Sequence, residues 1–349
     1  MLTHQKVKGI FAAGVTGGHI YPAIVVAEEM RKIVPLEATF IGTGRGAESR
    51  IFRNFPYKYK IIRARGSDVG RFSYIYHNGL AFFQAILTVQ KIRPHFVFTT
   101  GGYIGGIVGY AAHLLRVPVF LHEANVNAGV SNKKLSRYTL IEFCSFKPTM
   151  KEFPHAVLNG TPIRSDFYKL RDDNFKAEFS IVDDSKIVLA FGGSEGADKI
   201  DEIVDEVADE MKGYVFFHVG KLKIEKPNVI HFDYLDDMAY IMKNVDAVIS
   251  RAGASTIAEI IASSRPAILV PWKDSLNSHQ ESNARYLKEA GGAFVIDESN
   301  FSRETVKKLL EKIVEPEINS RMSRALEDLS SGSHSAEVIA RTIIKITLG

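Results

Sequence analysis

The chain has 349 residues, of which 46% are hydrophobic, and a formal net charge of +4 at pH 7. This length suffices for about two or three domains with full cores, and the single cysteine excludes a disulfide framework and a cysteine-rich metal site. The N-terminal residues lead almost directly into a strand pattern, so we expect no signal peptide, and no run of about 18 apolar residues predicts a membrane-spanning helix.

Charge is divided unequally along the chain. Residues 1–162 hold 20 Lys and Arg against 8 Asp and Glu, a net charge of +12, and residues 163–349 hold 24 against 32, a net charge of −8. Two interpretations are open: two domains with unlike surfaces, or a basic half that binds a polyanion or an anionic membrane. The size of the imbalance favours the second.

The first half alternates strand patterns with glycine turns that open helices. The first strand pattern is Val7–Ala13, followed by the turn Gly14–His19 and a helix to about Ile33. Glycines there let backbone N–H groups approach a ligand, although their spacing differs from the GxGxxG fingerprint of nicotinamide enzymes. The position of His19 suits both a catalytic residue and a structural turn residue. Further strands are expected at Ala38–Thr43, Tyr59–Arg63, Phe96–Thr100, Val117–Leu121, Thr139–Cys144 and Ala156–Leu158.

A second glycine turn, Gly101–Gly106, opens a helix that ends near Arg116, and the next strand pattern ends at His122 and Glu123. Ligands of open α/β sheets bind at the carboxyl ends of the strands. These two side chains are therefore candidate site residues. Asn125, Asn127 and Asn132 add polar groups nearby.

The segment Phe72–Arg93 is expected to be a helix whose apolar residues cover more than one narrow face, with Lys and Arg around it. Such a helix is either buried in the core or directed at a membrane surface. For the second case, Ile75, Phe82 and Phe83 are the candidates for shallow insertion.

The second half repeats this pattern after a linker at Asn159–Arg164. The strand Lys186–Phe191 leads to a third glycine turn, Gly192–Gly196. The strand Ala247–Ser250 turns at Arg251–Thr256 into a helix that Ser255 or Thr256 can cap, and a helix N-terminus offers N–H groups to an anion. The other strands are expected at Tyr214–Val219, Val229–Phe232, Ala267–Val270 and Ala293–Asp297.

Glu259 lies about one turn into this helix, where a carboxylate can reach the hydroxyls of a sugar whose phosphate sits at the helix N-terminus. The polar loop after the next strand adds His279, Gln280 and Asn283. These residues suit a nucleotide-sugar pocket. An ordinary βαβ unit with Glu259 on a solvated face is the alternative.

Taken together, these motifs resemble the UDP-N-acetylglucosamine:lipid I N-acetylglucosaminyltransferases of glycosyltransferase family 28 over nearly the whole chain. Gly14–His19 with Tyr21 and Pro22 is similar to the family's TGGHxxP loop, and Arg251–Glu259 resembles RSGAxTxxE. The substitutions at Ala124, Thr161 and Glu195 weaken any role for those three side chains. The other similar segments are Gly101–Gly106, His122–Asn125 (HEQN), Gly160–Arg164 (GNPVR), Gly192–Ala197 (GGSQGA) and His279–Ala284.

The resemblance implies an α/β protein with the GT-B fold, in which two Rossmann-like doubly wound domains face a cleft. Residues 1–162 would form an N-terminal domain that binds the acceptor and associates with the membrane, joined by the C-terminal helix 335–349. Residues 163–334 would form the C-terminal domain that binds UDP-N-acetylglucosamine.

The resemblance also implies an activity. The enzyme would transfer N-acetylglucosamine, with inversion, from UDP-N-acetylglucosamine to the 4-hydroxyl of the N-acetylmuramic acid of lipid I. The product would be lipid II for peptidoglycan synthesis, and hence for bacterial cell shape and division. No metal or other cofactor is implied, and the sequence contains no Asp-x-Asp motif.

Partners and location follow from the same resemblance. The expected partners are UDP-N-acetylglucosamine, lipid I, the anionic inner-membrane surface and other cell-wall synthesis proteins, with no nucleic acid. The expected location is peripheral, on the cytoplasmic face of the inner membrane.

Among the residues that the resemblance selects, His19 is the first choice for the general base, because a neutral imidazole accepts a proton near neutral pH, and Glu123 is the second. Arg164, backbone donors near Ser194 and the helix that starts near Thr256 would stabilise the leaving diphosphate. No residue is expected to bind a metal. The donor-binding residues would be Thr16, Gly17, Gly18, Asn125, Arg164, Ser194, Leu235, Thr256, Glu259, His279 and Gln280, and the acceptor-binding residues Tyr103, His122 and Asn132.

Two alternatives stay open. One is another GT-B glycosyltransferase with a lipid acceptor such as diacylglycerol, which the first-half loops and an acceptor assay would distinguish. The other is a non-catalytic nucleotide-sugar-binding protein, which would release no UDP when an acceptor is present. A nicotinamide oxidoreductase is a weak third, since the GxGxxG fingerprint is missing.

Overall fold

The computed structural model describes residues 6–46, 48–52, 56–66, 70–192, 197–273, 278–330 and 334–349, apart from the side chains of Arg50 and Arg71. The chain divides into two compact units. The first consists of Met1–Ile163 with His334–Gly349, and the second of Arg164–Ser333. The division falls within the segment expected to be the linker.

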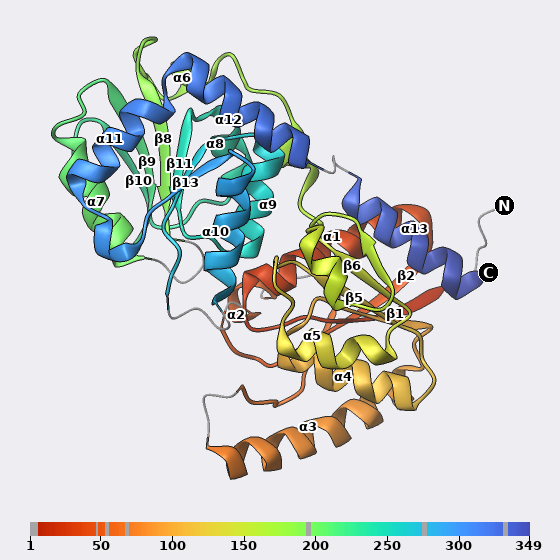
Figure 1. Cartoon of the computed structure of the whole chain (residues 1–349). Helices are drawn as coiled ribbons and strands as arrows, with labels where there is room; N and C mark the ends of the chain where they lie inside the picture. The colour runs from red at the N-terminus through yellow and green to blue at the C-terminus, as the bar shows by residue number, and fades with distance from the viewer. Residues whose placement is uncertain are drawn as a thin grey trace. The chain divides into compact units, whose positions relative to one another are not determined.

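Within the described residues, the first unit contains a seven-stranded parallel sheet in the order β3-β2-β1-β4-β5-β6-β7 (Figure 1). The order reverses between β1 and β4, where neighbouring loops at the carboxyl edge diverge and leave room for a ligand. The strands are β1 (Val7–Ala12), β2 (Leu36–Gly42), β3 (Lys58–Ile61), β4 (Phe96–Thr99), β5 (Val119–Glu123), β6 (Ile141–Cys144) and β7 (Ala156–Leu158).

Helices cover both faces of this sheet, which explains why its strands read as nearly continuous apolar runs. Phe11 stacks on Phe40 with ring centroids 5.0 Å apart, on the face covered by α1 and α13. Gly9 is required beside Phe96, since a Cβ atom there would lie 2.3 Å from the Phe96 ring. The helices are α1 (Gly17–Ile33), α2 (Glu48–Ile51), α3 (Arg71–Ile92), α4 (Gly102–Leu114), α5 (Val130–Leu135) and α13 (Ser335–Leu348), with the 3-10 turns η1 (Ser136–Tyr138) and η2 (Pro148–Glu152).

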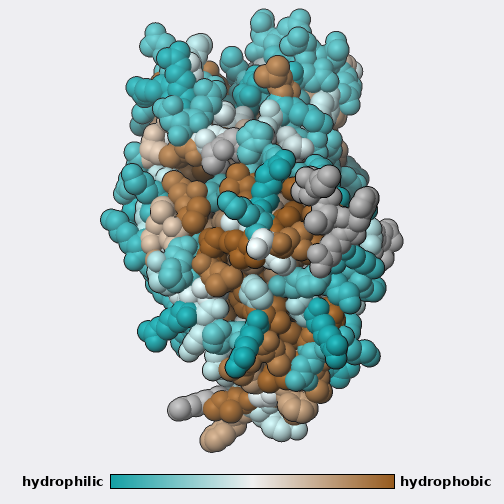
Figure 2. All heavy atoms as spheres, turned by 90° about the vertical axis from the view of Figure 1, so that its right-hand side faces the viewer, coloured by the Kyte–Doolittle hydropathy of each residue, from teal (hydrophilic) through white to brown (hydrophobic). Residues whose placement is uncertain are grey.

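Helix α3 is buried on one face only. Ala81 and Ala85 pack into the core, whereas Ile75 is 59% and Phe83 60% exposed, so the fully buried alternative is wrong. Phe82 packs against the core and stacks on a neighbouring ring of α4, which removes it from the insertion candidates. Figure 2 shows apolar side chains at the lower end of the first unit, where α3 lies. Among the described residues, no helix combines the length and apolar character that crossing a membrane requires.

The second unit contains, within its described residues, a six-stranded parallel sheet in the order β10-β9-β8-β11-β12-β13, which reverses between β8 and β11. The prediction of two doubly wound α/β units is confirmed. The strands are β8 (Lys186–Phe191), β9 (Tyr214–Val219), β10 (Val229–Phe232), β11 (Ala247–Ser250), β12 (Ala267–Leu269) and β13 (Ala293–Val295). The helices are α6 (Phe175–Glu178), α7 (Asp198–Ala208), α8 (Met238–Asn244), α9 (Ala254–Ser263), α10 (His279–Glu289), α11 (Arg303–Ile313) and α12 (Pro316–Leu329), with the 3-10 turns η3 (Ser165–Tyr168) and η5 (Glu298–Asn300).

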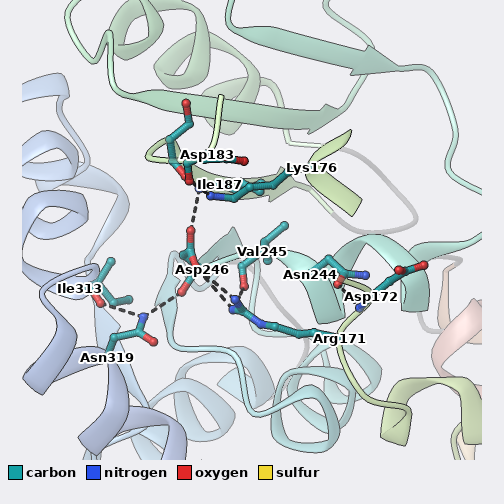
Figure 3. A network of polar contacts seen from close by, with 11 residues as sticks. Arg171, Asp172, Lys176, Asp183, Ile187, Asn244, Val245, Asp246, Ile313 and Asn319 are labelled. Atoms are coloured by element: carbon teal, nitrogen blue, oxygen red, sulfur yellow. Dashed lines mark hydrogen bonds and ion pairs between the residues drawn. The ribbon is translucent and has the colours of Figure 1, made fainter. Parts of the chain in front are cut away.

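A polar network around Asp246 fixes the amino edge of this second sheet (Figure 3). The Asp246 carboxylate accepts a hydrogen bond of 2.9 Å from the backbone N–H of Ile187, at the start of β8. Its other oxygen lies 3.4 Å from the Arg171 guanidinium, which also donates to the carbonyl of Val245 at 2.6 Å. The Asn319 side chain of α12 donates to the Asp246 carbonyl at 2.9 Å. The network therefore joins β8, β11 and α12 at the edge opposite the carboxyl ends of the strands.

Replacement of Asp246 should destabilise the second unit. In Asp246→Ala the Ile187 N–H loses its acceptor, at a cost of about 1–3 kcal/mol, and the Arg171 guanidinium keeps only the Val245 carbonyl. The single tryptophan of the chain, Trp272, lies in this unit, so its fluorescence can follow urea unfolding. The exposed Asp173 gives the control Asp173→Ala. Equal midpoints for the two variants would contradict this account of the network.

Candidate active site

His19 lies in the first turn of α1, at the carboxyl edge of the first sheet. Its Nδ1 is 2.9 Å from the carbonyl oxygen of Thr100, which follows β4, and the Thr100 hydroxyl donates to the His19 carbonyl at 2.7 Å. A carbonyl can only accept, so Nδ1 carries the hydrogen and the lone pair of the neutral ring is at Nε2. A Cβ atom built on Gly102 would lie 3.7 Å from this Nε2, so the basic nitrogen lies beside the second glycine turn. The two glycine turns thus meet at the reversal of strand order.

Glu48 is a site residue that the sequence analysis missed. It is fully buried, and its carboxylate accepts hydrogen bonds from the N–H of Val15 at 2.6 Å, the hydroxyl of Thr43 at 2.8 Å and the N–H of Gly44 at 2.7 Å. The Tyr59 hydroxyl also donates to it. Val15 has a φ of 73°, which is rare for a β-branched residue, so the loop before His19 is held in a strained conformation. The only sequence signal for Glu48 was its position after the glycines Gly44 and Gly46. That position does not reveal its partner Val15, which lies 33 residues earlier in the chain.

Glu123, the second candidate base, is buried and fully occupied by donors. It accepts hydrogen bonds from the N–H of Asn125 at 2.9 Å and its side-chain amide at 3.0 Å. It also accepts from the N–H of Gly129 at 2.9 Å and the Asn132 amide at 2.7 Å. Through these four hydrogen bonds the carboxylate orders the loop between β5 and α5. The structure therefore gives Glu123, Asn125 and Asn132 a common role in building that loop.

His122 is buried beside this loop. Its Nε2 lies 3.2 Å from the Gly160 carbonyl and 3.2 Å from the Ser145 hydroxyl, and Ser145 also pairs with the Thr161 hydroxyl at 2.6 Å. Burial lowers the pKa of His122 to about 4, so the ring is neutral. Its Nδ1 has no hydrogen-bond partner among the described residues. The hydroxyl of Thr161 is thus linked to His122 through the Ser145 hydroxyl.

The remaining candidates of the first unit are at the glycine turns. Thr16 is the N-cap residue of α1 without a side-chain capping bond, and Gly17 and Gly18 form the first turn of that helix. A helix N-terminus without a side-chain cap suits an anion. Tyr103, in the first turn of α4, packs partly into the core. The structure thus brings these residues and His19 to one edge of one sheet.

In the second unit, the turn after β11 ends at Gly253, which is the N-cap residue of α9 and makes no side-chain capping bond. The expectation that Ser255 or Thr256 caps this helix is wrong, because both lie inside its first turn, where a side chain cannot adopt the N-cap geometry. Thr256 is buried, and the hydroxyl of Ser255 has no partner among the described residues. The helix N-terminus therefore keeps its N–H groups for an anion.

Glu259 is partly buried in the second turn of α9. Burial raises the pKa of its carboxyl to about 7, and the Arg164 guanidinium acts in the opposite direction. Arg164 is exposed and lies with its guanidinium carbon 5.6 Å from the ring centre of Phe167. A carboxyl with a strongly raised pKa near an exposed cation is a common feature of binding sites.

Gln280 joins the two loops that follow β11 and β12. Its side-chain oxygen accepts from the N–H of Ala252 at 3.3 Å and the N–H of Trp272 at 3.0 Å. The buried Asn283, one turn later, donates to the Ala252 carbonyl at 3.2 Å. His279 begins α10 beside these contacts. The first turn of α10 therefore fixes the loops at this edge of the second sheet.

The candidates divide between the units. Leu235 lies in the connection between β10 and α8, in the same unit as Arg164, Thr256, Glu259, His279 and Gln280. Ser194 lies outside the described residues. The candidates of the first unit are Thr16, Gly17, Gly18, His19, Tyr103, His122, Glu123, Asn125 and Asn132.

Comparisons with known proteins match both units. Residues 10–143 match the glycosyltransferase family 28 N-terminal domain, and residues 187–341 match the glycosyltransferase family 28 C-terminal domain. A UDP-N-acetylglucosamine--N-acetylmuramyl-(pentapeptide) pyrophosphoryl-undecaprenol N-acetylglucosamine transferase from Caldicellulosiruptor saccharolyticus is 35% identical over 340 residues, covering 90% of this chain and 92% of the relative. A protein of the same name from Sulfurihydrogenibium sp. is 34% identical over 331 residues, covering 92% and 93%.

The fold also matches a solved structure. The crystal structure of Acinetobacter baumannii MurG superimposes with a TM-score of 0.79 at 24% identity, and the match covers 98% of this chain and 100% of that one. This likeness supports the GT-B fold of the chain.

Glu48 should control the loop that precedes His19. Val15 and Gly44 donate to different oxygens of Glu48, and Glu48→Gln replaces one of these oxygens by an NH2 group. At least one of the two backbone N–H groups should therefore lose its acceptor and exchange with solvent faster. Leaving such donors unpaired costs about 1–3 kcal/mol. Hydrogen–deuterium exchange measures this, with Tyr59→Phe as the control that removes a single donor. Unchanged exchange at both Val15 and Gly44 in Glu48→Gln would refute the role of the carboxylate.

Glu259 should make stability depend on pH with a defined sign. Its pKa is raised from an ordinary value of 4.5 to about 7 in the folded chain, so stability falls as the pH rises from about 4.5 to about 7 and is level above that. Glu259→Gln should therefore raise the Tm at about pH 8 and leave it unchanged near pH 4.5. The exposed Glu289 gives the control Glu289→Gln. The same Tm difference at both pH values would show that Glu259 has an ordinary pKa.

Proposed function

The chain belongs to glycosyltransferase family 28, and from this premise we propose that it transfers N-acetylglucosamine from UDP-N-acetylglucosamine to the 4-hydroxyl of the muramyl sugar of lipid I, forming lipid II. The observation that carries this proposal is the match of both family domains in order, together with relatives of this stated activity that cover nine-tenths of the chain. The alternatives of another lipid acceptor or of binding without catalysis have no comparable support.

The donor is proposed to bind in the second unit. The N-terminus of α9 at Thr256 would hold the diphosphate, because its N–H groups are unpaired by any cap and its dipole favours an anion. Glu259, one turn further, would accept hydrogen bonds from the ribose hydroxyls as the carboxylate. Arg164 would add a planar cation that binds phosphate oxygens in bidentate geometry. Leu235, His279 and Gln280 would complete the nucleotide-sugar site.

The first unit would supply the base. His19 Nε2 would take the proton of the acceptor hydroxyl while that oxygen attacks the anomeric carbon and the bond to the UDP oxygen breaks. The Thr100 carbonyl fixes the tautomer with the lone pair at Nε2 and would stabilise the imidazolium that forms. Glu123 is occupied by four donors, which supports His19 over Glu123. Leaving-group charge would be stabilised by protein groups, since the sequence lacks an Asp-x-Asp motif.

The direct test of this function is a transfer assay. Labelled UDP-N-acetylglucosamine and a short-chain lipid I analogue should yield a labelled disaccharide and an equal amount of UDP. Diacylglycerol in place of the analogue should yield neither. Transfer to diacylglycerol alone would favour the first alternative, and binding of the donor without UDP release would favour the second.

His19→Ala should lower kcat by roughly 10²–10⁴, because the acceptor hydroxyl loses its base. Affinity for UDP should stay nearly unchanged, since Arg164, Thr256 and Glu259, which are proposed to hold the diphosphate and the ribose, belong to the second unit. Steady-state kinetics and calorimetric titration with UDP measure the two effects. His19→Gln is the control that keeps a side chain of similar size with a hydrogen-bond donor but has no basic nitrogen, and its kcat should fall by a similar factor. A near-normal kcat in both variants would reject His19 as the base.

The first unit is also proposed to dock on an anionic membrane at its cytoplasmic face. Phe72, Ile75 and Phe83 form an exposed apolar surface on α3, with exposed fractions of 89%, 59% and 60%. Lys91, in the last turn of α3, and Arg63, in the segment before this helix, are exposed, within a half of the chain that carries +12. Apolar insertion ringed by cations is typical of proteins that bind reversibly to anionic lipid.

The double variant Ile75→Ser with Phe83→Ser should lose binding to anionic vesicles in a co-sedimentation assay. Binding of the unchanged protein should require anionic lipid and fall with added salt, since each Lys or Arg near the surface contributes about 1 kcal/mol that salt screens. Val182→Ser is the control, because Val182 is 73% exposed in the second unit. Equal sedimentation with neutral vesicles would argue against this docking surface.

A further inference from the structure

A chain of four titratable side chains runs through the second unit from α7 to the residue that follows β10. Asp201 lies 3.0 Å from His218 Nε2, and His218 Nδ1 lies 3.0 Å from His231 Nδ1. His231 Nε2 lies 3.3 Å from Asp233. Asp201 and His218 are buried, the His231 side chain is 12% exposed and that of Asp233 is 93% exposed. The chain therefore connects the interior of the unit with solvent.

The inner end of this chain fixes one histidine tautomer. The Asp201 carboxylate also accepts hydrogen bonds from the backbone N–H of Lys221 at 3.1 Å and of Leu222 at 3.3 Å, so that with His218 Nε2 it has three donors. His218 must then carry a hydrogen on Nε2. Burial lowers the pKa of His218, so the ring is neutral and its Nδ1 is an acceptor. Gly220 leaves room for this arrangement, because a Cβ atom there would lie 2.3 Å from Asp201 and 2.6 Å from His218 Nε2.

The tautomer of His218 decides what His231 can do. Because His218 Nδ1 accepts, His231 must donate from its own Nδ1. Neutral His231 then has a lone pair on Nε2, which faces the Asp233 carboxylate and repels it. Only the imidazolium has an Nε2 hydrogen for Asp233. The contact between His231 and Asp233 therefore exists only when His231 is protonated.

We propose that His231 is a positioning residue for donor binding. When His231 is protonated, its Nε2 hydrogen bond fixes the position of Asp233. Asp233 in turn fixes the connection from Asp233 to Asp237, which contains Leu235. This inference rests on the proposed function, in which Leu235 belongs to the site for the donor nucleotide. Asp233 directly follows β10, and Asp237 caps α8 through the N–H of Tyr240. Protonation of His231 thus adds a second anchor at the other end of this short connection.

Among the described charged side chains around His231, Asp233 is the one that its Nε2 faces on the solvent side. Asp201 on α7 and His218 on β9 face it from within the unit. β10 pairs with β9 alone among the described strands. Lys223, in the connection between β9 and β10, acts on Asp233 through space and forms its own ion pair with Glu225 at 2.5 Å. A pH effect that requires the Asp233 carboxylate therefore reports the proton on His231.

The test compares two variants that remove the same charge from the same connection. Asp233→Asn loses the contact with His231, whereas Asp236→Asn removes an exposed carboxylate two residues before the start of α8. Calorimetry with the full-length protein gives the Kd for UDP-N-acetylglucosamine, a diphosphate diester, between about pH 5.5 and about pH 8.5. Titration of Glu259 is common to both variants and cancels in their ratio.

The ratio of the Kd of Asp233→Asn to that of Asp236→Asn should be about two- to fivefold at the low end of the range, as expected for a partly exposed ion pair. This ratio of Kd values should approach one at the high end of the pH range, where His231 is neutral in both variants. A ratio that is the same at every pH would overturn the inference, as would a ratio of one throughout.

A second measurement separates this inference from the proposed function. Nitrogen-15 NMR of the free protein should show His231 titrating at a lower pH in Asp233→Asn than in Asp236→Asn. Identical titrations would overturn the proton-dependent contact whatever the protein binds. A wild-type protein that binds no UDP-N-acetylglucosamine at any pH would instead overturn the proposed function, and the role of His231 in donor binding with it.

Discussion

The reversal of strand order in each parallel sheet is the constraint on which the rest of the structure depends. The loops that follow β1 and β4 in the first unit lead toward opposite edges of the sheet, and so do the loops that follow β8 and β11 in the second unit. The loops at the carboxyl ends of those strands diverge there, so helix N-termini and glycine turns can approach a ligand. His19 follows β1, and the turn before Glu259 follows β11. Both candidate sites thus arise from one topological feature that the chain uses twice.

Buried carboxylates give these loops their shape. Glu48 and Glu123 have several N–H or O–H donors each, and no Lys or Arg side chain among the described residues donates to either. A buried anion of this kind is stabilised only while the loop keeps its donors directed inward, so it fixes backbone conformation over several residues. Glu259 differs, because burial raises its pKa to about 7 and no donor to its carboxyl is found among the described residues. The number of donors therefore separates Glu48 and Glu123, which order their loops, from Glu259.

The sequence was sufficient to predict most of the fold and only part of the site. Strands such as Lys186–Phe191 and Ala247–Ser250 were predicted at their observed bounds, because buried parallel strands are continuous apolar runs between turn residues. The cap assigned to Ser255 or Thr256 was wrong, since the composition of a turn does not determine the residue at which the helix begins. Glu48 could not be found, because its partners are distant in sequence. The chain from Asp201 to Asp233 was missed for the same reason. The roles assigned to His19 and Glu259 stay predictions.

The central claim is a single displacement at the anomeric carbon by the acceptor hydroxyl, without a covalent glycosyl-enzyme intermediate. The configuration of the new glycosidic bond tests this claim most directly. UDP-N-acetylglucosamine is the α-anomer, so one displacement gives a β-linked disaccharide, whereas two successive displacements restore the α-linkage. NMR spectroscopy of the purified product distinguishes the two from the coupling of the anomeric proton. The account predicts a β-linked product, and an α-linked product would contradict it.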